Sequence, residues 1–392
     1  MGLSMFSAQT SPIAIDFGSS SVKLLQISGA DPPVLVAAAE VTIPDASRES
    51  TDQLLAFYSR AIPRLIQASK CKGKRVVCAV PSGQTMIQHM QLAGVEGVSR
   101  DDLVKAQLQT QMGWLPENVV VRALEVAQVH QGGQSKSETI CFAVPRDIVM
   151  QYVDLMRKCK LELVGVDTEV MAMVRAFDHQ AHAVDGSDIV TMYVDLGWGG
   201  TKVAMTHNEH IVFARHVQIG GRHFDQHLAA ALHCDLPSAR AHRLSLQASG
   251  PAAPTPGPDD DAGLASDGGP AVETATAAAT AVTAGQGSSG AASVDLSEQL
   301  DMICDELSMC LRYHQGLFPN RSVDRVIFIG GEARQKWLCQ HVMKVLGLKA
   351  QLGDPLARLG VSNSARTPGL IRGQPQPGWA VPCGLCTAPT DL

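Results

Sequence analysis

The stretch Ile-Ala-Ile-Asp-Phe-Gly-Ser-Ser-Ser-Val-Lys at residues 13–23 carries the strongest fold signal in the sequence. An apolar run ends in Asp16, Gly18 follows two residues later, and a serine turn leads into a second apolar run at 22–28. Glycine lets backbone N–H groups approach phosphate oxygens closely, and hydroxyls add donors. A carboxylate at a strand end can hold a hydrated Mg²⁺, which takes only one or two carboxylates. The stretch predicts a phosphate-binding hairpin, although one such hairpin alone is more often an ordinary turn.

The same pattern returns in the second half of the chain. Asp195-Leu196-Gly197-Trp198-Gly199-Gly200-Thr201 again joins an apolar strand to a glycine-rich turn and another strand. Two such hairpins in corresponding places would clamp a polyphosphate from both sides, which favours a binding site over two unrelated turns. A third glycine element, Gly330-Gly331-Glu332, follows a strand and opens a helix, where it could approach a nucleoside. Taken alone, this junction is usually plain backbone packing.

The order of predicted elements indicates a weak internal duplication. Strands, a hairpin and helices occur once in each half of the chain. The apolar patterns predict strands at 13–17, 22–28, 34–43, 75–80, 119–129, 138–144, 161–166, 189–195, 200–206, 210–218, 323–329 and 347–352, and helices at 54–67, 101–112, 146–159, 169–177, 222–232, 296–318 and 332–346.

We place domain boundaries where composition and pattern change. The expected parts are a first lobe beginning at 12–94, an inserted α/β subdomain at 95–160, a return to the first lobe at 161–186, a second lobe at 187–248 and 294–355, a disordered loop at 249–293, and a C-terminal segment at 356–392 that returns in part to the first lobe. The loop consists of Ala, Gly, Pro, Thr, Ser and Asp without an aromatic residue, so it cannot bury enough apolar surface to offset its ordering entropy.

Composition excludes several classes of function. The 392 residues carry 32 Lys and Arg against 38 Asp and Glu, a net charge of −6. Five of the acids and none of the bases lie in the loop at 249–293, so the remainder is almost neutral. We therefore expect no nucleic-acid partner and no anionic membrane surface. No apolar run reaches the roughly 18 residues of a membrane span, which predicts a cytoplasmic protein with no direct span.

Two short groupings could signal metal chemistry. Cys383 and Cys386 form a CxxC pair without a second pair, and His223 and His227 lie at i, i+4 on one predicted helix. We favour small core residues for the cysteines and a solvated helix face for the histidines over a metal site at either place. The ten scattered cysteines otherwise read as reduced buried thiols.

The three glycine motifs, in this order, resemble the two phosphate motifs and the adenosine motif of the actin, Hsp70 and FtsA ATPase superfamily. Within it, the sequence resembles the PilM family of type IV pilus assembly. The matching text is IAIDFGSSSVKLLQI from residue 13, VGVDTEVMAMVRAF from 164, YVDLGWGGTKVAM from 193, IGGRHFDQHL from 219 and VIFIGGEARQKWL from 326. The resemblance implies an α/β actin-like ATPase fold: two ribonuclease-H-like lobes with an FtsA-like inserted α/β subdomain.

The resemblance also implies a site for ATP or ADP with Mg. Asp16 and Asp195 would bind Mg²⁺ through water. Asp167 or Glu169 would orient the attacking water, although Asp167 and Thr168 read equally well as a helix cap. The residues implied around the nucleotide are Asp16, Gly18, Ser19, Ser20, Lys23, Asp195, Gly197, Gly200, Thr201, Arg243, Gly330, Gly331 and Glu332.

Three departures from the family pattern bear on hydrolysis. Lys202 stands where relatives often have an acidic residue, and Trp198 is bulky for its turn. In the helix that often gives a Lys to the nucleoside site, only Arg243 could substitute. We therefore expect nucleotide binding with weak or absent ATP hydrolysis.

The implied function is a scaffold of pilus assembly and twitching motility. Relatives bind the N-terminal cytoplasmic peptide of a bitopic PilN-like protein in a groove beside the inserted subdomain, and so connect to the pilus motor complex. Such a peptide would owe its affinity to buried apolar anchors. The protein would then lie peripherally at the inner membrane through that partner. The sequence is also compatible with a homo-oligomer or ring.

Two other functions remain as alternatives. A small-molecule kinase of the same superfamily would need a carboxylate base on a loop of the first half, for which Asp45 and Glu49 are the candidates. A cell-division actin-like protein would carry a basic amphipathic C-terminal helix, whereas residues 369–392 are rich in Pro and Gly.

Overall fold

The structure is a computed structural model that describes residues 10–131, 134–181, 187–246, 294–371 and 373–390. The predicted disordered loop at 249–293 lies outside these residues. The chain divides into two compact units, the first formed by residues up to 222 and from 303 onward, the second by residues 223–302. The first contains all three sheets and both glycine-rich hairpins.

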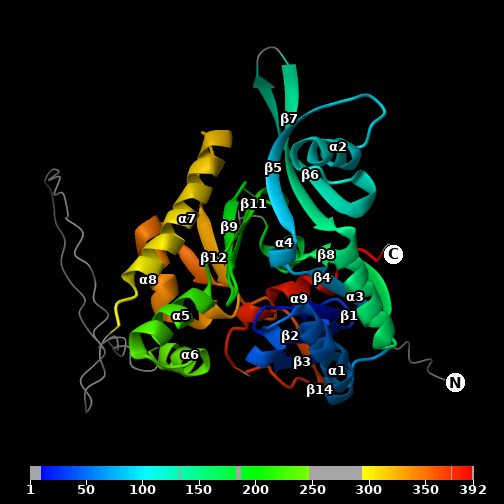
Figure 1. The fold of residues 1–392 in the computed structure, drawn as a ribbon, viewed down its shortest axis with the longest axis vertical. Coiled ribbons are helices and arrows are strands. Elements are labelled where there is room, and N and C mark those ends of the chain that lie inside the picture. Colours follow the sequence, from blue (N-terminus) through cyan, green and yellow to red (C-terminus); the bar gives the residue numbers. More distant parts are fainter. Residues whose placement is uncertain (1–9, 132–133, 182–186, 247–293, 372, 391–392) are drawn as a thin grey trace, which may run out of the picture. The chain divides into compact units, whose positions relative to one another are not determined.

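A six-stranded mixed sheet is built around the first hairpin (Figure 1). Its strands lie in the order β14 (Gly360–Arg366), β3 (Val34–Thr42), β2 (Ser21–Ile27), β1 (Ile13–Phe17), β4 (Arg75–Val80) and β8 (Glu162–Thr168). The first three strands of the chain form an antiparallel meander, and β4 and β8 extend it in parallel from β1. Strand β14 closes the far edge in parallel with β3.

A five-stranded sheet repeats this plan around the second hairpin. Its order is β11 (His210–Val217), β10 (Thr201–His207), β9 (Val190–Leu196), β12 (Arg325–Ile329) and β13 (Ala350–Leu352). Strands β9, β10 and β11 form an antiparallel meander, and β12 and β13 extend it in parallel from β9. In each sheet the strand that ends in the motif aspartate is therefore the one at which the meander meets the parallel strands.

A smaller antiparallel sheet of β5 (Met86–Ala93), β7 (Gln134–Pro145) and β6 (Val119–Gln131) carries α2 (Arg100–Met112) on one face (Figure 1). Met90, Leu92, Val104 and Leu108 are among the buried residues of its own core. Strand β5 was not predicted, and it begins before the expected subdomain boundary at 95. Its side chains are mostly half-buried and polar ones interrupt the apolar ones, so its sequence lacks a strong strand pattern.

The remaining helices include the predicted ones, whereas α9 (Ala380–Leu385) was not predicted. They are α1 (Thr51–Ser69), α3 (Arg146–Lys158), α4 (Glu169–Arg175), α5 (Gly221–Leu232), α6 (Leu236–Ser245), α7 (Ser297–Leu317), α8 (Lys336–Leu346) and α9 (Ala380–Leu385). Short 3-10 turns lie at Asp45–Arg48, Ser82–Gln84, Pro116–Asn118, Asp178–Gln180, Glu332–Arg334 and Pro377–Trp379. None of the helices in the described part of the chain combines the length and apolarity needed to cross a bilayer.

Alternation along β1 divides the six-stranded sheet into two buried faces. Ile13, Ile15 and Phe17 pack on one side against α1 and α3, while Ala14 faces the opposite side. Because Asp16 follows this alternation, its side chain lies on the face of Ala14. Helix α3, expected within the inserted subdomain, thus contributes its apolar face to the core of the six-stranded sheet.

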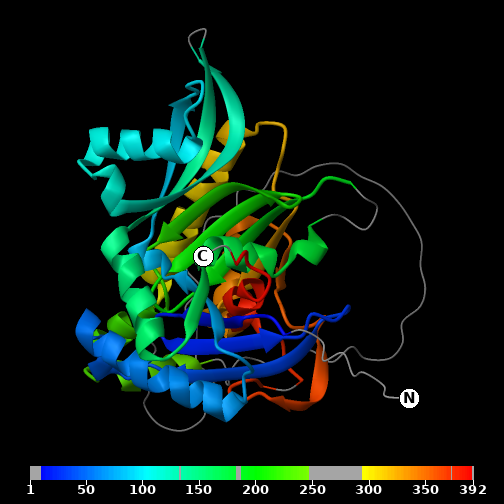
Figure 2. The same cartoon turned by 90° about the vertical axis from the view of Figure 1, so that its right-hand side faces the viewer.

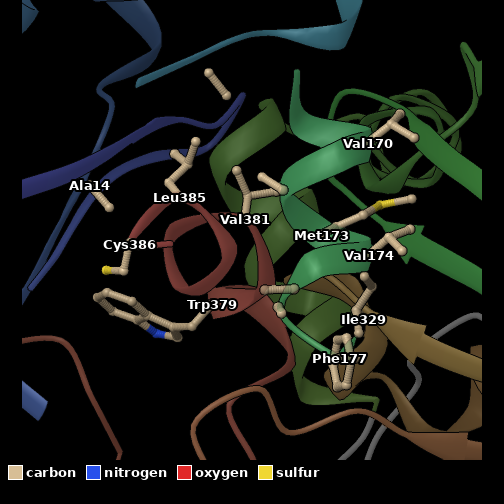
Figure 3. Close-up of a cluster of buried hydrophobic side chains, with 14 of the residues drawn as sticks. Ala14, Val170, Met173, Val174, Phe177, Ile329, Trp379, Val381, Leu385 and Cys386 are labelled. Atoms are coloured by element: carbon tan, nitrogen blue, oxygen red, sulfur yellow. The ribbon is translucent and has the colours of Figure 1, made fainter. Parts of the chain in front are cut away.

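The C-terminal segment fills the face of the sheet that carries Ala14. Figure 2 shows α9 between the strands of the first half and those of the second, and Figure 3 shows Trp379 and Leu385 in the same cluster as Ala14, Met173 and Phe177. Trp379 is fully buried. A Cβ on Gly384 would lie 1.8 Å from the carbonyl oxygen of Ala172, so α9 can approach α4 this closely only with glycine there.

This packing accounts for the CxxC pair. Cys386 is buried in the same cluster, its thiol donating to the carbonyl of Leu25 at 3.7 Å, and the Cys383 thiol donates to the carbonyl of Pro355 at 3.3 Å. Burial raises the pKa of the Cys383 thiol to about 12, so neither a thiolate nor a metal ligand is favoured. The two cysteines act as small core residues.

The second unit contains α6, most of α5 and the start of α7. Asp235 begins α6 by accepting a hydrogen bond from the backbone N–H of Ser238 at 2.8 Å. His227, one member of the histidine pair at i, i+4, hydrogen-bonds the side chain of Gln299 at 3.0 Å. Among the described residues no group of three or more His, Cys, Asp or Glu side chains is placed to hold a metal ion.

Candidate functional site

The first hairpin places an aspartate and a lysine side by side. Asp16 ends β1 and lies directly opposite Lys23 on β2. Directly opposed residues of an antiparallel pair point to the same face. The Lys23 ammonium lies 3.8 Å from Oε1 of Glu40, to which the Ser21 hydroxyl also donates at 2.7 Å. Lys23 is thus held at the rim of the hairpin by a neighbouring strand.

The second hairpin repeats this pair with a different outcome. Asp195 ends β9 and lies directly opposite Lys202 on β10, again seven residues later. Here the ammonium turns inward, 2.9 Å from Oδ2 of Asp195 and 3.4 Å from Oε1 of Glu169. All three side chains are nearly buried. Lys202 is therefore the cation that joins the second hairpin to the start of α4.

Glu169 is held on both of its carboxylate oxygens. Thr168 begins α4 as its N-cap by accepting from the N–H of Met171 at 3.1 Å, which points Glu169 inward at the first turn. The N–H of Ser82 donates to Oε2 at 2.6 Å, while Lys202 occupies Oε1. Burial alone would raise the pKa of Glu169, but Lys202 and the donors of Ser82 outweigh it and lower that pKa. In return Asp195 and Glu169 raise the pKa of Lys202 against its burial.

Asp16 lies beside this network and directly opposite Lys23. Burial raises its pKa to about 7, Lys23 acts in the opposite direction, and the Glu169 carboxylate raises it further. Within the described residues its Oδ1 is buried and has no hydrogen-bond partner. A buried polar atom without a partner costs about 1–3 kcal/mol, so the site favours a ligand that can donate to this oxygen.

The turns of the two hairpins touch each other. The N–H of Gly199 donates to the Ser19 hydroxyl oxygen at 2.9 Å. Arg48 donates to the carbonyl of Ser19 at 3.1 Å and that of Ser20 at 3.3 Å, and its guanidinium lies 4.6 Å from the centre of the Trp198 ring. The bulky Trp198 of the second turn thus packs on a cation bound to the first turn.

The third glycine motif lies against the second hairpin. Strand β12 pairs in parallel with β9, with Ile329 opposite Asp195, so the chain leaves β12 beside that aspartate. Gly330 has a φ of +93°, and its N–H donates to the carbonyl of Pro377 at 2.9 Å. A Cβ there would lie 2.2 Å from Oδ1 of Asp195 and 2.4 Å from the carbonyl of Leu196. Only glycine satisfies both the angle and the space.

Gly330→Ala is expected to lower the free energy of unfolding by about 1–2 kcal/mol from the backbone alone, with the contact against Asp195 adding to the loss. Gly331→Ala is the matched control, because Gly331 has a φ of −65° and a Cβ there meets nothing within 4 Å. Urea denaturation of both variants measures the difference. Equal midpoints would show that the junction tolerates a side chain.

The family model described as type IV pilus assembly protein PilM matches residues 14–247, which is more than half of the chain and includes both hairpins. The chain belongs to the PilM family. It is thus a type IV pilus assembly protein.

One solved structure confirms the predicted fold of this PilM-family chain. A structure titled PilM-PilN type IV pilus biogenesis complex matches with a TM-score of 0.72 at 16% identity, covering 97% of this chain and 98% of that one. More distant matches include the ethanolamine utilization protein EutJ from Carboxydothermus hydrogenoformans (TM-score 0.46, 12% identity, 96% and 89% covered) and MreB5 of Spiroplasma citri bound to ADP (TM-score 0.46, 11% identity, 96% and 94% covered).

The structure gathers some of the expected PilM site residues and gives others a local role. Asp16, Glu169 and Asp195 lie around Lys202, and Gly330 joins them. The turns contain Gly18, Ser19, Ser20, Gly197 and Gly200. The Thr201 hydroxyl donates to the carbonyl of Ile219 at 2.7 Å, and Asp167 pairs with Arg175 at 2.7 Å. At the junction after β12, Gly331 is exposed and Glu332 is buried.

Arg243 lies in the second unit. Its side chain is fully buried, and its Nε donates to Oδ1 of Asp225 at 2.6 Å, also within that unit. Its guanidinium therefore stabilises the packing of α6 against α5.

Sequence reasoning missed two contributors to the site. Arg48 and Ser82 stand in no motif. Arg48 follows β3 and Ser82 follows β4, and only the packing of these strands in the sheet brings them to the turns and to Glu169. Lys202 was noted only as a departure from the family pattern. Its spacing of seven residues from Asp195, the same as that of Lys23 from Asp16, was the available signal.

The expected magnesium does not fit the donors as they are arranged. The Asp195 carboxylate, one of the two expected to hold the hydrated ion, lies 2.9 Å from the Lys202 ammonium. That ammonium also contacts the Glu169 carboxylate, so it occupies the place between the two carboxylates where a divalent cation would bind, and the cation would meet like charge there. Of the three carboxylates Asp16, Glu169 and Asp195, only that of Asp16 has a buried oxygen without a hydrogen-bond partner among the described residues.

Proposed function

We propose that this PilM-family protein is a cytoplasmic, nucleotide-binding scaffold that grips the N-terminal peptide of a PilN-like membrane protein. The observation that carries the proposal is the match, over nearly the full length of both chains, to the solved PilM-PilN complex. Bound in this way, the protein would lie peripherally at the inner membrane. It would connect the pilus motor complex to the membrane proteins that serve twitching motility.

The two hairpins support binding of ATP or ADP. Ser19 and Gly199 are exposed at the facing turns, where the Gly199 N–H donates to the Ser19 hydroxyl oxygen. A phosphate group entering between the turns would replace this hydrogen bond, which contributes only about 1 kcal/mol net. Bonds to a charged phosphate are roughly twice as strong, so the exchange favours the nucleotide.

Hydrolysis is expected to be weak or absent. A residue that orients or deprotonates the attacking water needs a carboxylate oxygen free to accept. Both oxygens of Glu169 are engaged by Lys202 and Ser82, and Asp167 is paired with Arg175. Turnover should therefore fall well below the roughly 1 to 10³ s⁻¹ of typical enzymes. The kinase alternative gains no support from Asp45, one of its two candidate bases, because Asp45 is ion-paired with Arg48.

Ser19→Asp is expected to weaken ATP binding by about tenfold or more, because it places a carboxylate where a phosphate would lie. Titration of a fluorescent ATP analogue into the wild type and the variant measures the change. Ser50→Asp is the matched control, since Ser50 is the N-cap of α1 and aspartate caps equally well. Equal affinities of wild type and Ser19→Asp would exclude nucleotide between these turns.

An apolar surface on the inserted subdomain supports the peptide-binding part of the proposal. Large apolar side chains at least 39% exposed occur there at Val95, Val98, Met112, Leu115, Val120 and Met150. Met112 is the last residue of α2, Leu115 follows it closely, and Val120 is the second residue of β6. A peptide that buries such side chains gains affinity from apolar anchors without needing charge.

The double variant Met112→Asp, Leu115→Asp is expected to weaken binding of the N-terminal peptide of a PilN-like protein by more than about tenfold, because it removes two apolar contacts. Fluorescence anisotropy of the labelled peptide measures the affinity. Val345→Asp on α8, at a residue 51% exposed, is the control for surface charge. If both variants bind as the wild type does, the peptide does not use this surface.

A further inference from the structure

We propose that the ammonium group of Lys202 takes the place of a divalent cation in this protein, so that it binds a nucleoside polyphosphate without magnesium. This inference rests on the proposed nucleotide binding and specifies its chemistry. Nothing in the two hairpins requires a metal if a fixed cation already stands at the aspartate of the second one.

The position of Lys202 supports this role. Its ammonium lies against Asp195, at the end of β9 and beside the glycine turn that would receive phosphate oxygens. The Lys202 side chain is 13% exposed and the carboxylates of Asp195 and Glu169 are 7% exposed each, so the three are fixed by packing. A preorganised cation of this kind loses little freedom when an anion arrives.

The number of hydrogen-bond donors supports it as well. An ammonium has three N–H donors, and the two carboxylates account for two of them. A third can reach an anionic oxygen.

The comparison of the two hairpins makes the assignment specific. Lys23 and Lys202 occupy the same register position opposite the motif aspartates. Lys23 forms an ion pair at 3.8 Å with Glu40, which lies outside the motif. Lys202 instead bridges Asp195 and Glu169 in the interior. Of the two equivalent lysines, Lys202 is therefore the one placed as a metal substitute.

The test uses the full chain and ATP with either excess EDTA or excess Mg²⁺, read by isothermal titration calorimetry. We expect the wild-type dissociation constants to agree within about twofold. Binding that is tighter by about tenfold or more with Mg²⁺ would overturn the inference while leaving the nucleotide site intact. No binding in either buffer would refute the nucleotide part of the proposed function and the inference with it.

A second measurement does not depend on nucleotide. In Lys202→Asp the buried carboxylates lose their cation, so we expect Mn²⁺ alone to raise the Tm of this variant by several degrees and that of the wild type by less than about 1 °C. Lys105→Asp, at a lysine on α2 whose ammonium lies 3.8 Å from Asp102, controls for added surface charge. A wild type stabilised by Mn²⁺ as strongly as Lys202→Asp would contradict the proposal. Should Lys202→Asp not fold without metal, its recovery by refolding in Mn²⁺ but not in EDTA gives the same information.

Discussion

Lys202→Met is expected to lower the free energy of unfolding by about 3–5 kcal/mol, among the largest losses available to a single substitution in this chain. The methionine fills similar space but leaves the carboxylates of Asp195 and Glu169 buried without their cation. Uncompensated buried charge is costly because no solvent replaces the lost partner. Urea denaturation, followed by circular dichroism, measures the loss.

A second substitution separates charge from packing. Adding Glu169→Gln to Lys202→Met removes one of the two unpaired carboxylates, so the double variant should be more stable than Lys202→Met alone. Lys105→Met serves as the control, because its ion pair with Asp102 is exposed and should contribute no more than about 0.5 kcal/mol. A loss below about 1 kcal/mol in Lys202→Met would show that the network is not formed as described.

Trp379→Ala is expected to cost about 3–5 kcal/mol through the cavity it leaves. Trp379 is fully buried in the cluster that joins α9, α4 and the strands of both large sheets (Figure 3). A void at this place loosens contacts made by both halves of the first unit. Thermal and urea denaturation measure the change.

Trp379→Phe should lose much less. In the described structure the indole N–H of Trp379 is buried without a hydrogen-bond partner. Removing this N–H offsets part of the stability that the smaller ring loses in packing. If the phenylalanine variant is as unstable as the alanine variant, the loss of stability does not follow the volume of the cavity.

Much of the fold could be predicted because local pattern and function coincide in the hairpins. Asp16 and Asp195 each end an apolar strand before a glycine turn, and the structure places both at the edge where a meander meets parallel strands. Repetition of one motif at a fixed spacing carried more information than either copy alone, and it led to the actin-like fold that the PilM family shows.

What could not be predicted depends on tertiary contact. Residues 369–392 are rich in Pro and Gly, yet Trp379 and Leu385 are buried because α4 and the six-stranded sheet offer a matching surface. Strand β14 has an exposed and largely polar sequence, and it forms only because β3 leaves an edge to pair with. Composition describes an isolated segment and cannot register an edge supplied elsewhere.

The site residues show the same limit. Glu169 was one of two candidates for orienting water, and the sequence offered no reason to couple it to Lys202 or Ser82. Lys202 and Ser82 lie 33 and 87 residues from Glu169 along the chain, and only the topology of the two sheets brings them into contact with it. A lysine read as a departure from the family pattern proves to be the centre of the polar network.

The burial of α9 against Ala14 bears on how the protein is made in the cell. The face of β1 that carries Ala14 is completed by side chains that lie more than 360 residues later in the chain. At about 5–20 residues per second, the ribosome needs on the order of tens of seconds to supply them. During that interval the strands of the first sheet expose apolar surface, so we expect the nascent protein to depend on chaperones until α9 has emerged.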